Sequence, residues 1–169
     1  MQRKGNVMTK TKNPYIEYKE KNRKQFHSLP IFFAFSREQY KKAMEERGLT
    51  ENDTDKIYRL SDTGGFYLKS DAEKIHSFFN QPDNLSELME SEKGFAYSAF
   101  YYELGNHEYH INEYQGDYDV CRCFGRCEYS PDKDYKDYLK EMGYSDSVIS
   151  SFEKARKDFM NYVDKNDLY

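Results

Sequence analysis

Residues 31–36 read Ile-Phe-Phe-Ala-Phe-Ser, and the fold class follows from interpreting this stretch first. Its five apolar side chains, bounded by Pro30 and Ser36, have the length and bulk of a buried strand. Ser36 and Gln39 have capping-box spacing, in which two side chains satisfy free backbone N–H groups at the start of a helix. The sequence therefore predicts a strand that leads directly into a helix, which ends at Gly48.

The next segments extend this pattern. Residues 57–60 and 66–68 are short enough and apolar enough for two strands, and Gly64-Gly65 between them suits a hairpin turn. Ser70 has the spacing of a second capping box and predicts a helix that ends before Pro82. A third helix is predicted over residues 97–104, where apolar side chains recur every three or four positions.

The second half of the chain predicts one more hairpin and two helices. Glu108–Asn112 and Tyr118–Phe124 resemble strands joined through Gln115-Gly116. After Pro131, apolar spacing predicts helices on either side of Gly143, the second of them capped by Ser145. The order of elements indicates an α+β fold, with a small mainly antiparallel sheet covered by several helices and a helical pair at the C-terminus.

The composition supports one folded domain. The chain has 169 residues, of which 37% are hydrophobic and 17% aromatic, so large rings supply most of the core. We expect Phe33 or Phe35, Phe100 and Phe152 to be buried, because each lies in an apolar run or stripe.

Charged residues are distributed unevenly along the chain. Residues 1–30 contain eight Lys or Arg and two Glu, a net charge of +6, which leaves −10 on residues 31–169. We expect residues 1–30 to be a basic, largely flexible arm and residues 31–169 to be a single α+β domain. A short helix is expected around Tyr15–Gln25. The arm fits a nucleic-acid contact, a solubilising tail, or an amphipathic helix that packs on the acidic body through Tyr15, Ile16 and Tyr18.

Hydropathy and cysteine content limit the location. No apolar run approaches the 18 residues of a membrane span, and the Lys-rich start lacks the apolar segment of a secretory signal. Three clustered cysteines, Cys121, Cys123 and Cys127, are an odd number and suit a reducing compartment. We expect a cytoplasmic protein with no membrane partner.

Carboxylates concentrate between Glu103 and Asp119, a segment without Lys or Arg. If residues 118–124 form a strand, Asp117 and Asp119 project from one face. Paired carboxylates of this kind hold Mg²⁺ or Mn²⁺ in phosphodiester chemistry, with His107 as acid or base. A small metal-dependent hydrolase or nuclease is therefore one hypothesis, although no phosphate-binding loop accompanies the pair.

Histidines and cysteines in the same region offer nitrogen and sulfur ligands for zinc. The candidates for a tetrahedral site are His107, His110, Cys121, Cys123 and Cys127. Their spacing is irregular and contains no Cys-x-x-Cys pair, so buried free thiols are the alternative, and we expect no cofactor. A cysteine nucleophile paired with His107 requires a positive site that lowers the thiol pKa, and the sequence marks none.

A binding surface is the other interpretation of the acidic segment. Clustered carboxylates repel one another, and a basic partner relieves that repulsion, while neighbouring tyrosines supply rigid anchors. The residues expected at this surface are Glu103, Glu108, Tyr109, Glu113, Tyr114, Asp117, Tyr118 and Asp119.

Several phrases of the sequence resemble an uncharacterised family of small proteins from phages and mobile elements of Gram-positive, often gut-dwelling, bacteria. The resemblance covers Ile31–Tyr169. The phrases that carry it are Phe32–Ser36 with Gln39, Asp55–Tyr58, Gly64–Phe66, Asn106–Tyr109, and Gly116–Cys121 with Phe124-Gly125.

The resemblance implies an accessory role in a mobile element, and such families include anti-CRISPR inhibitors of host defence. We therefore expect a binding protein, rather than an enzyme, that inhibits a basic host protein such as a CRISPR effector nuclease. Such effectors hold nucleic acid in positively charged channels, for which an acidic body can compete. A phage regulator that binds DNA through the basic arm is the remaining alternative.

Overall fold

The computed structural model describes residues 13–168, except for the side chains of Asp62, Glu113 and Tyr114. These residues form two compact units. The mixed unit comprises residues 20–82, and the helical unit comprises the described residues up to 19 together with those from 83 onward.

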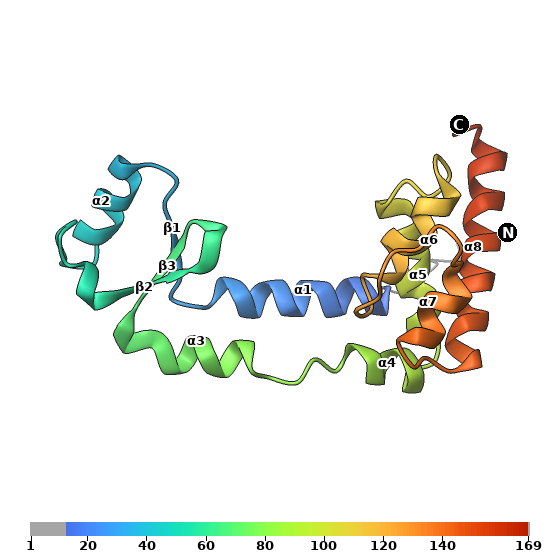
Figure 1. Ribbon diagram of the computed structural model, residues 1–169, viewed down its shortest axis with the longest axis horizontal. Helices are drawn as coiled ribbons and strands as arrows, with labels where there is room; N and C mark the ends of the chain where they lie inside the picture. The colour runs from blue at the N-terminus through green and yellow to red at the C-terminus, as the bar shows by residue number, and fades with distance from the viewer. Residues whose placement is uncertain (1–12, 169) are drawn as a thin grey trace, which may run out of the picture. The chain divides into compact units, whose positions relative to one another are not determined.

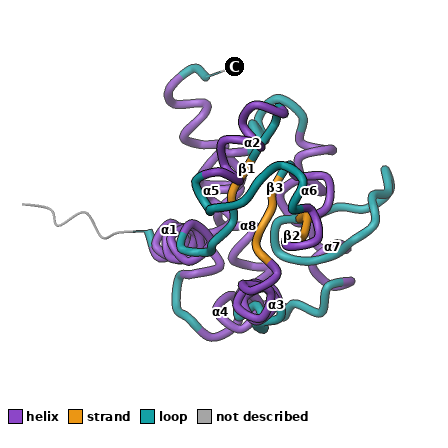
Figure 2. The backbone as a smooth tube through the Cα atoms, turned by 90° about the vertical axis from the view of Figure 1, so that its left-hand side faces the viewer, coloured by secondary structure: helices purple, strands orange, loops and turns teal. Residues whose placement is uncertain are grey.

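The mixed unit contains the sheet. Its strands are β1 (Phe32–Phe33), β2 (Ile57–Leu60) and β3 (Gly65–Leu68), which pair in the order β1-β3-β2 with both pairs antiparallel (Figures 1 and 2). Two helices, α2 (Arg37–Glu45) and α3 (Ala72–Phe79), follow the first and the last of these strands in sequence. The second part of α1 (Pro14–His27), from residue 20 onward, also belongs to this unit.

The helix α2 begins at the Ser36–Gln39 cap, as the sequence predicted. The Ser36 side chain accepts a hydrogen bond from the Gln39 backbone N–H at 3.2 Å, and the Gln39 side chain accepts one from the Phe35 N–H at 2.8 Å. The predicted hairpin of β2 and β3 is also present. Gly64 has a φ of +71°, and a Cβ there would lie 2.7 Å from the Phe35 ring, so the turn requires glycine.

The expected core residue in the 31–36 stretch was wrong. Phe33 and Phe35 are 44% and 76% exposed, whereas Phe32 is 6% exposed. The strand is only two residues long, and alternation turns Phe32 inward, where its ring stacks on Phe66 at 5.6 Å. The Arg47 guanidinium covers the Phe32 ring at 4.1 Å.

The helical unit packs its helices around α5 and α8, which lie side by side (Figure 1). Phe100 of α5 packs edge-on against Phe124 and Phe152, each with ring centroids 4.9 Å apart, and Tyr135 stacks on Phe152 at 4.5 Å. Phe100 and Phe152 are fully buried, as the sequence predicted. The helices of this unit are the first part of α1 (Pro14–His27), α4 (Leu85–Ser91), α5 (Phe95–Asn106), α6 (Glu113–Cys121), α7 (Tyr135–Glu141) and α8 (Asp146–Asn166).

The hairpin expected over residues 108–124 is replaced by α6. The Asn112 side chain begins this helix by accepting a hydrogen bond from the Gln115 N–H at 3.3 Å. The helix buries Asp117, Val120 and Cys121, which lie three and four positions apart rather than two. Helical periodicity therefore governs this segment, where we expected the two-residue alternation of a strand.

The N-terminal region also differs from expectation. The helix expected around Tyr15–Gln25 is present as α1, but the chain divides within this helix and again after residue 82, rather than once at residue 30. Tyr15 is only 4% exposed, because its ring packs edge-on against Phe95 at 5.9 Å. Residues 1–12 of the expected arm lie outside the described residues.

The structure confirms the α+β class and the C-terminal helices. The described residues contain eight α-helices and one three-stranded antiparallel sheet. The Ser145 side chain caps α8 as predicted, by accepting from the Val148 N–H. Within residues 13–168, the helices are all too short or too polar to cross a membrane.

Truncating the central aromatic rings tests this core. We expect Phe152→Ala to lower the free energy of unfolding by about 3–5 kcal/mol, because the ring is fully buried between Phe100 and Tyr135. The matched control is Phe35→Ala, whose ring is 76% exposed and which should change stability by less than about 1 kcal/mol. Denaturant unfolding followed by circular dichroism measures both; equal losses would contradict the assigned core.

Candidate functional site

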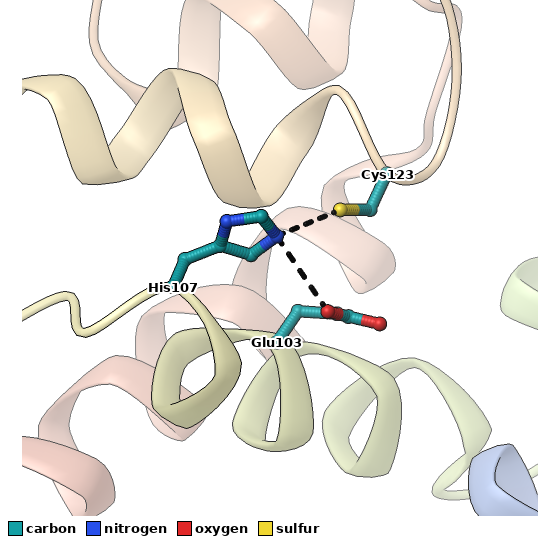
Figure 3. A group of neighbouring side chains, drawn as sticks. All are labelled: Glu103, His107 and Cys123. Atoms are coloured by element: carbon teal, nitrogen blue, oxygen red, sulfur yellow. Dashed lines mark hydrogen bonds and ion pairs between the residues drawn. The ribbon is translucent and has the colours of Figure 1, made fainter.

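A polar cluster of Glu103, His107 and Cys123 lies within the helical unit (Figure 3). Glu103 and His107 are four residues apart at the C-terminal end of α5, so their side chains share one helix face. Cys123 lies two residues beyond α6. The His107 Nε2 atom is 3.2 Å from Cys123 Sγ and 3.7 Å from Glu103 Oε2.

Glu103 is the buried charge of this cluster, at 2% exposure. Its Oε1 accepts hydrogen bonds from the Tyr15 hydroxyl and the Lys19 ammonium, both at 2.7 Å. Its Oε2 accepts one from the Asn106 side chain at 2.8 Å. Burial by itself raises the pKa of Glu103, but these donors and the positive charge of Lys19 outweigh burial, so the net pKa is lowered. The carboxylate is therefore ionised at neutral pH.

Cys123 is a thiol rather than a thiolate at neutral pH. Burial, and then the nearby Glu103 charge, raise the pKa of Cys123 to about 11. The Cys123 Sγ lies 3.4 Å from the Asp119 carbonyl oxygen, to which the thiol donates. Lys19 and Arg122 oppose this shift without reversing it. The His107–Cys123 pair consequently lacks the low thiol pKa that a cysteine nucleophile needs.

The other predicted zinc ligands lie elsewhere. Cys121 is fully buried and its Sγ is 3.9 Å from the Tyr135 carbonyl oxygen, while the His110 ring packs near Phe159. Cys127 is half-buried. In the described part of the chain, Glu103, His107 and Cys123 are the only three such groups with ligand atoms within 4.8 Å of one another. Sequence reasoning missed Glu103 as their partner, although its i, i+4 spacing from His107 was a usable signal.

The two aspartates proposed for phosphodiester chemistry do not form a pair. Because α6 is a helix, positions two apart point to different sides. Asp117 is buried and accepts hydrogen bonds from the Tyr109 hydroxyl at 2.7 Å and the Tyr135 N–H at 3.2 Å. Burial raises the pKa of Asp117. Asp119 is instead 29% exposed and lies 3.8 Å from Arg122.

The expected acidic surface is only partly a surface. Glu103, Tyr109 and Asp117 are buried, so they cannot contact a partner without unfolding. Glu108 is exposed, whereas Tyr118 and Asp119 are half-buried. The structure does not describe the side chains of Glu113 and Tyr114.

Three tyrosines connect the core to the surface. Tyr138 is fully buried, its ring centroid lies 5.6 Å from that of Tyr118, and Tyr118 in turn packs edge-on against Tyr129 at 5.3 Å. Tyr129 is 51% exposed. The Tyr138 hydroxyl also donates to the Ser130 carbonyl oxygen at 2.8 Å, which holds the loop that carries Tyr129. The exposed Tyr129 ring thereby rests on a half-buried ring, which in turn rests on a buried one.

Both carboxylates and cations lie beside these three tyrosines. The Arg122 guanidinium lies 5.7 Å from the Tyr118 ring centroid and 3.8 Å from the Asp119 carboxylate, and Lys133 forms an ion pair with Glu141. Asp119 and the exposed Glu128 each neighbour one of these rings in sequence, and the exposed Glu141 carboxylate accepts the backbone N–H of Glu128. We call Tyr118, Asp119, Glu128, Tyr129 and Glu141 the Tyr129 face.

The acidic charge belongs to the helical unit. Residues 83–169 contain 19 Asp or Glu and 10 Lys or Arg, whereas residues 20–82 contain 10 acidic and 11 basic residues. Glu103 and Asp117 are the only acidic side chains classed as buried among those described. Most of the negative charge of this unit therefore faces solvent.

Residues 14–121 match a family of unknown function, DUF7659, and the chain belongs to this family. The match begins at the first residue of α1 and ends at the last residue of α6, so it includes Glu103 and His107. No curated protein and no solved structure matches the chain.

The buried Glu103 should dominate the acid sensitivity of the fold. Its folded-state pKa is lowered, so its stabilisation is fully present above the unfolded pKa of about 4.3 and is lost as the pH falls through the folded value. We expect Glu103→Gln to lower the free energy of unfolding by about 1–3 kcal/mol at pH 7. Between pH 5 and pH 3, this variant should lose less stability than wild type does.

Glu108→Gln is the matched control, because Glu108 is exposed and directly follows His107 without belonging to the cluster. Its free energy of unfolding should follow that of wild type to within about 0.5 kcal/mol at every pH. Denaturant titrations from pH 3 to pH 7 measure both variants. Parallel curves for Glu103→Gln and wild type would contradict the assigned role of the carboxylate.

Proposed function

We propose that the protein acts by binding a cationic macromolecular partner through the Tyr129 face, and that this partner is a nucleic-acid-handling protein of the CRISPR effector class. The observation that carries the proposal is an exposed, rigidly held tyrosine bordered by carboxylates on a strongly acidic unit.

Tyr129 has the properties of an interface anchor. Tyrosine buries a large area on binding and loses little conformational entropy, which is why it is enriched among residues that dominate binding energy. Tyr129 is half exposed, yet its ring already rests on Tyr118, and Tyr118 rests on the buried Tyr138. Little ordering remains when a partner covers it.

The surrounding charge favours a basic partner. The helical unit has nine more acidic than basic residues from residue 83 onward, and almost all of these carboxylates are exposed or half-buried. Such a field accelerates association with a positively charged protein and weakens as salt is added. Positively charged nucleic-acid channels are a surface of matching sign.

The chemistry of the unit supports binding over catalysis. The cysteine beside His107 has a raised pKa, and the buried carboxylate there is neutralised by Lys19. Asp117 and Asp119 lie on different sides of α6, so they do not form a two-carboxylate metal site. The resemblance to small proteins of phages and mobile elements adds the expectation that the partner is a host defence nuclease.

The test is inhibition of guide-directed DNA cleavage by a purified Cas9-type effector. We expect wild type to inhibit stoichiometrically and Tyr129→Ala to bind the effector at least about 30-fold more weakly, as loss of an anchor worth about 2 kcal/mol requires. The matched control is Tyr162→Ala, because Tyr162 is also 51% exposed but lies on α8. This control should inhibit like wild type.

A charge-reversed variant separates the electrostatic contribution. Glu128→Lys combined with Glu141→Lys should slow association about tenfold at low ionic strength, and the difference from wild type should shrink as salt is added. Biolayer interferometry with immobilised effector measures both rates. Wild type that neither binds the effector nor inhibits cleavage at micromolar concentration refutes this partner class, and equal affinities of Tyr129→Ala and Tyr162→Ala refute this face.

A further inference from the structure

We infer that Glu103, His107 and Cys123 form a zinc site, with one carboxylate oxygen, one imidazole nitrogen and one sulfur as ligands and a water molecule in the fourth position. This inference is independent of the proposed binding function. It rests on the arrangement of three ligand atoms from two separate segments of the helical unit (Figure 3).

The spacing of the atoms fits tetrahedral zinc. Zinc bonds of about 2.3 Å to sulfur and about 2.0–2.2 Å to nitrogen or oxygen place nitrogen and sulfur about 3.5 Å apart, and nitrogen and oxygen about 3.4 Å apart. The His107 Nε2 atom lies 3.2 Å from Cys123 Sγ and 3.7 Å from Glu103 Oε2. Both distances agree with the zinc values to within about 0.3 Å.

The hydrogen bonds of Glu103 leave room for the ion. A carboxylate has about four lone-pair sites, two on each oxygen. The Tyr15 hydroxyl and Lys19 ammonium donate to Oε1, whereas the Asn106 side chain donates to Oε2. One lone-pair site therefore remains on Oε2, and this oxygen is the one that faces His107. The donors on Oε1 and from Asn106 hold the carboxylate in orientation, as outer partners of metal ligands do.

Charge and ligand type also favour zinc. Glu103 is ionised, and zinc binding replaces the Cys123 thiol proton, which passes to solvent as the Zn–S bond forms. Mixed sulfur, nitrogen and oxygen ligands suit zinc, whereas Mg²⁺ and Ca²⁺ prefer oxygen alone. A bound ion would join the end of α5 to the segment that follows α6, and through Glu103 it would join both to α1.

Cobalt(II) is the probe, since it occupies zinc sites and reports its ligands by absorption. Titration of the full-length, reduced protein with Co²⁺ alone should give one saturable site with a sulfur-to-cobalt charge-transfer band, which Zn²⁺ abolishes by displacement. Cys123→Ser should lose the band and bind at least about tenfold more weakly. Cys127→Ser is the matched control, because Cys127 is also half-buried but outside the cluster, and it should keep the band.

A second measurement needs no variant. Zn²⁺ should slow alkylation of Cys123 by iodoacetamide in the wild-type protein, read by peptide mass spectrometry, and should leave the rate at Cys127 unchanged. No thiolate band in wild type, a band that survives Cys123→Ser, or alkylation of Cys123 that Zn²⁺ leaves unaffected would each overturn the site.

Discussion

The helical unit depends on one ionised carboxylate that is almost completely removed from water. Glu103 is 2% exposed, and an unpaired charge at such a position would cost several kcal/mol. Its donors come from two places in the chain: Asn106 on its own helix, and Tyr15 and Lys19 on α1, more than 80 residues earlier. This requirement explains why the first turns of α1 belong with residues 83 onward.

The same carboxylate determines the chemistry next to it. Its charge is one reason that the Cys123 thiol keeps its proton, and its free lone pair faces His107. The cluster therefore suits a metal ion better than a nucleophile. The Tyr129 face is a separate feature of the unit, where the surface combines a fixed aromatic ring with exposed carboxylates.

Local signals in the sequence predicted most of the secondary structure. The Ser36–Gln39 cap, the hairpin around Gly64 and the cap at Ser145 are each made by residues close in sequence, so their patterns were sufficient. We expected a strand in the segment before Cys121 because its polar and aromatic residues alternate. The segment is a helix instead, and its burial depends on glycine at position 116. A Cβ at Gly116 would lie 2.6 Å from the Tyr109 ring, a contact that only the folded chain reveals.

The candidate site was predictable only in part, for a related reason. Charge in a sequence is normally a sign of exposure, so Glu103 and Asp117 were assigned to a surface, and α1 to a flexible arm. Their burial depends on partners distant in sequence, such as Lys19 for Glu103 and Tyr135 for Asp117. His107 and Cys123 were identified as candidates by residue type, but their third partner, Glu103, was assigned to the acidic surface despite its i, i+4 spacing from His107.

The most direct test of this account is a double-mutant cycle on Lys19 and Glu103. Free energies of unfolding are measured at pH 7 for wild type, Lys19→Met, Glu103→Gln and the double variant. The account predicts a coupling energy of at least about 1 kcal/mol, because removing either partner leaves the other charge without its counterion. Additive effects, to within about 0.3–0.5 kcal/mol, would contradict the claim that this pair holds the first turns of α1 against α5.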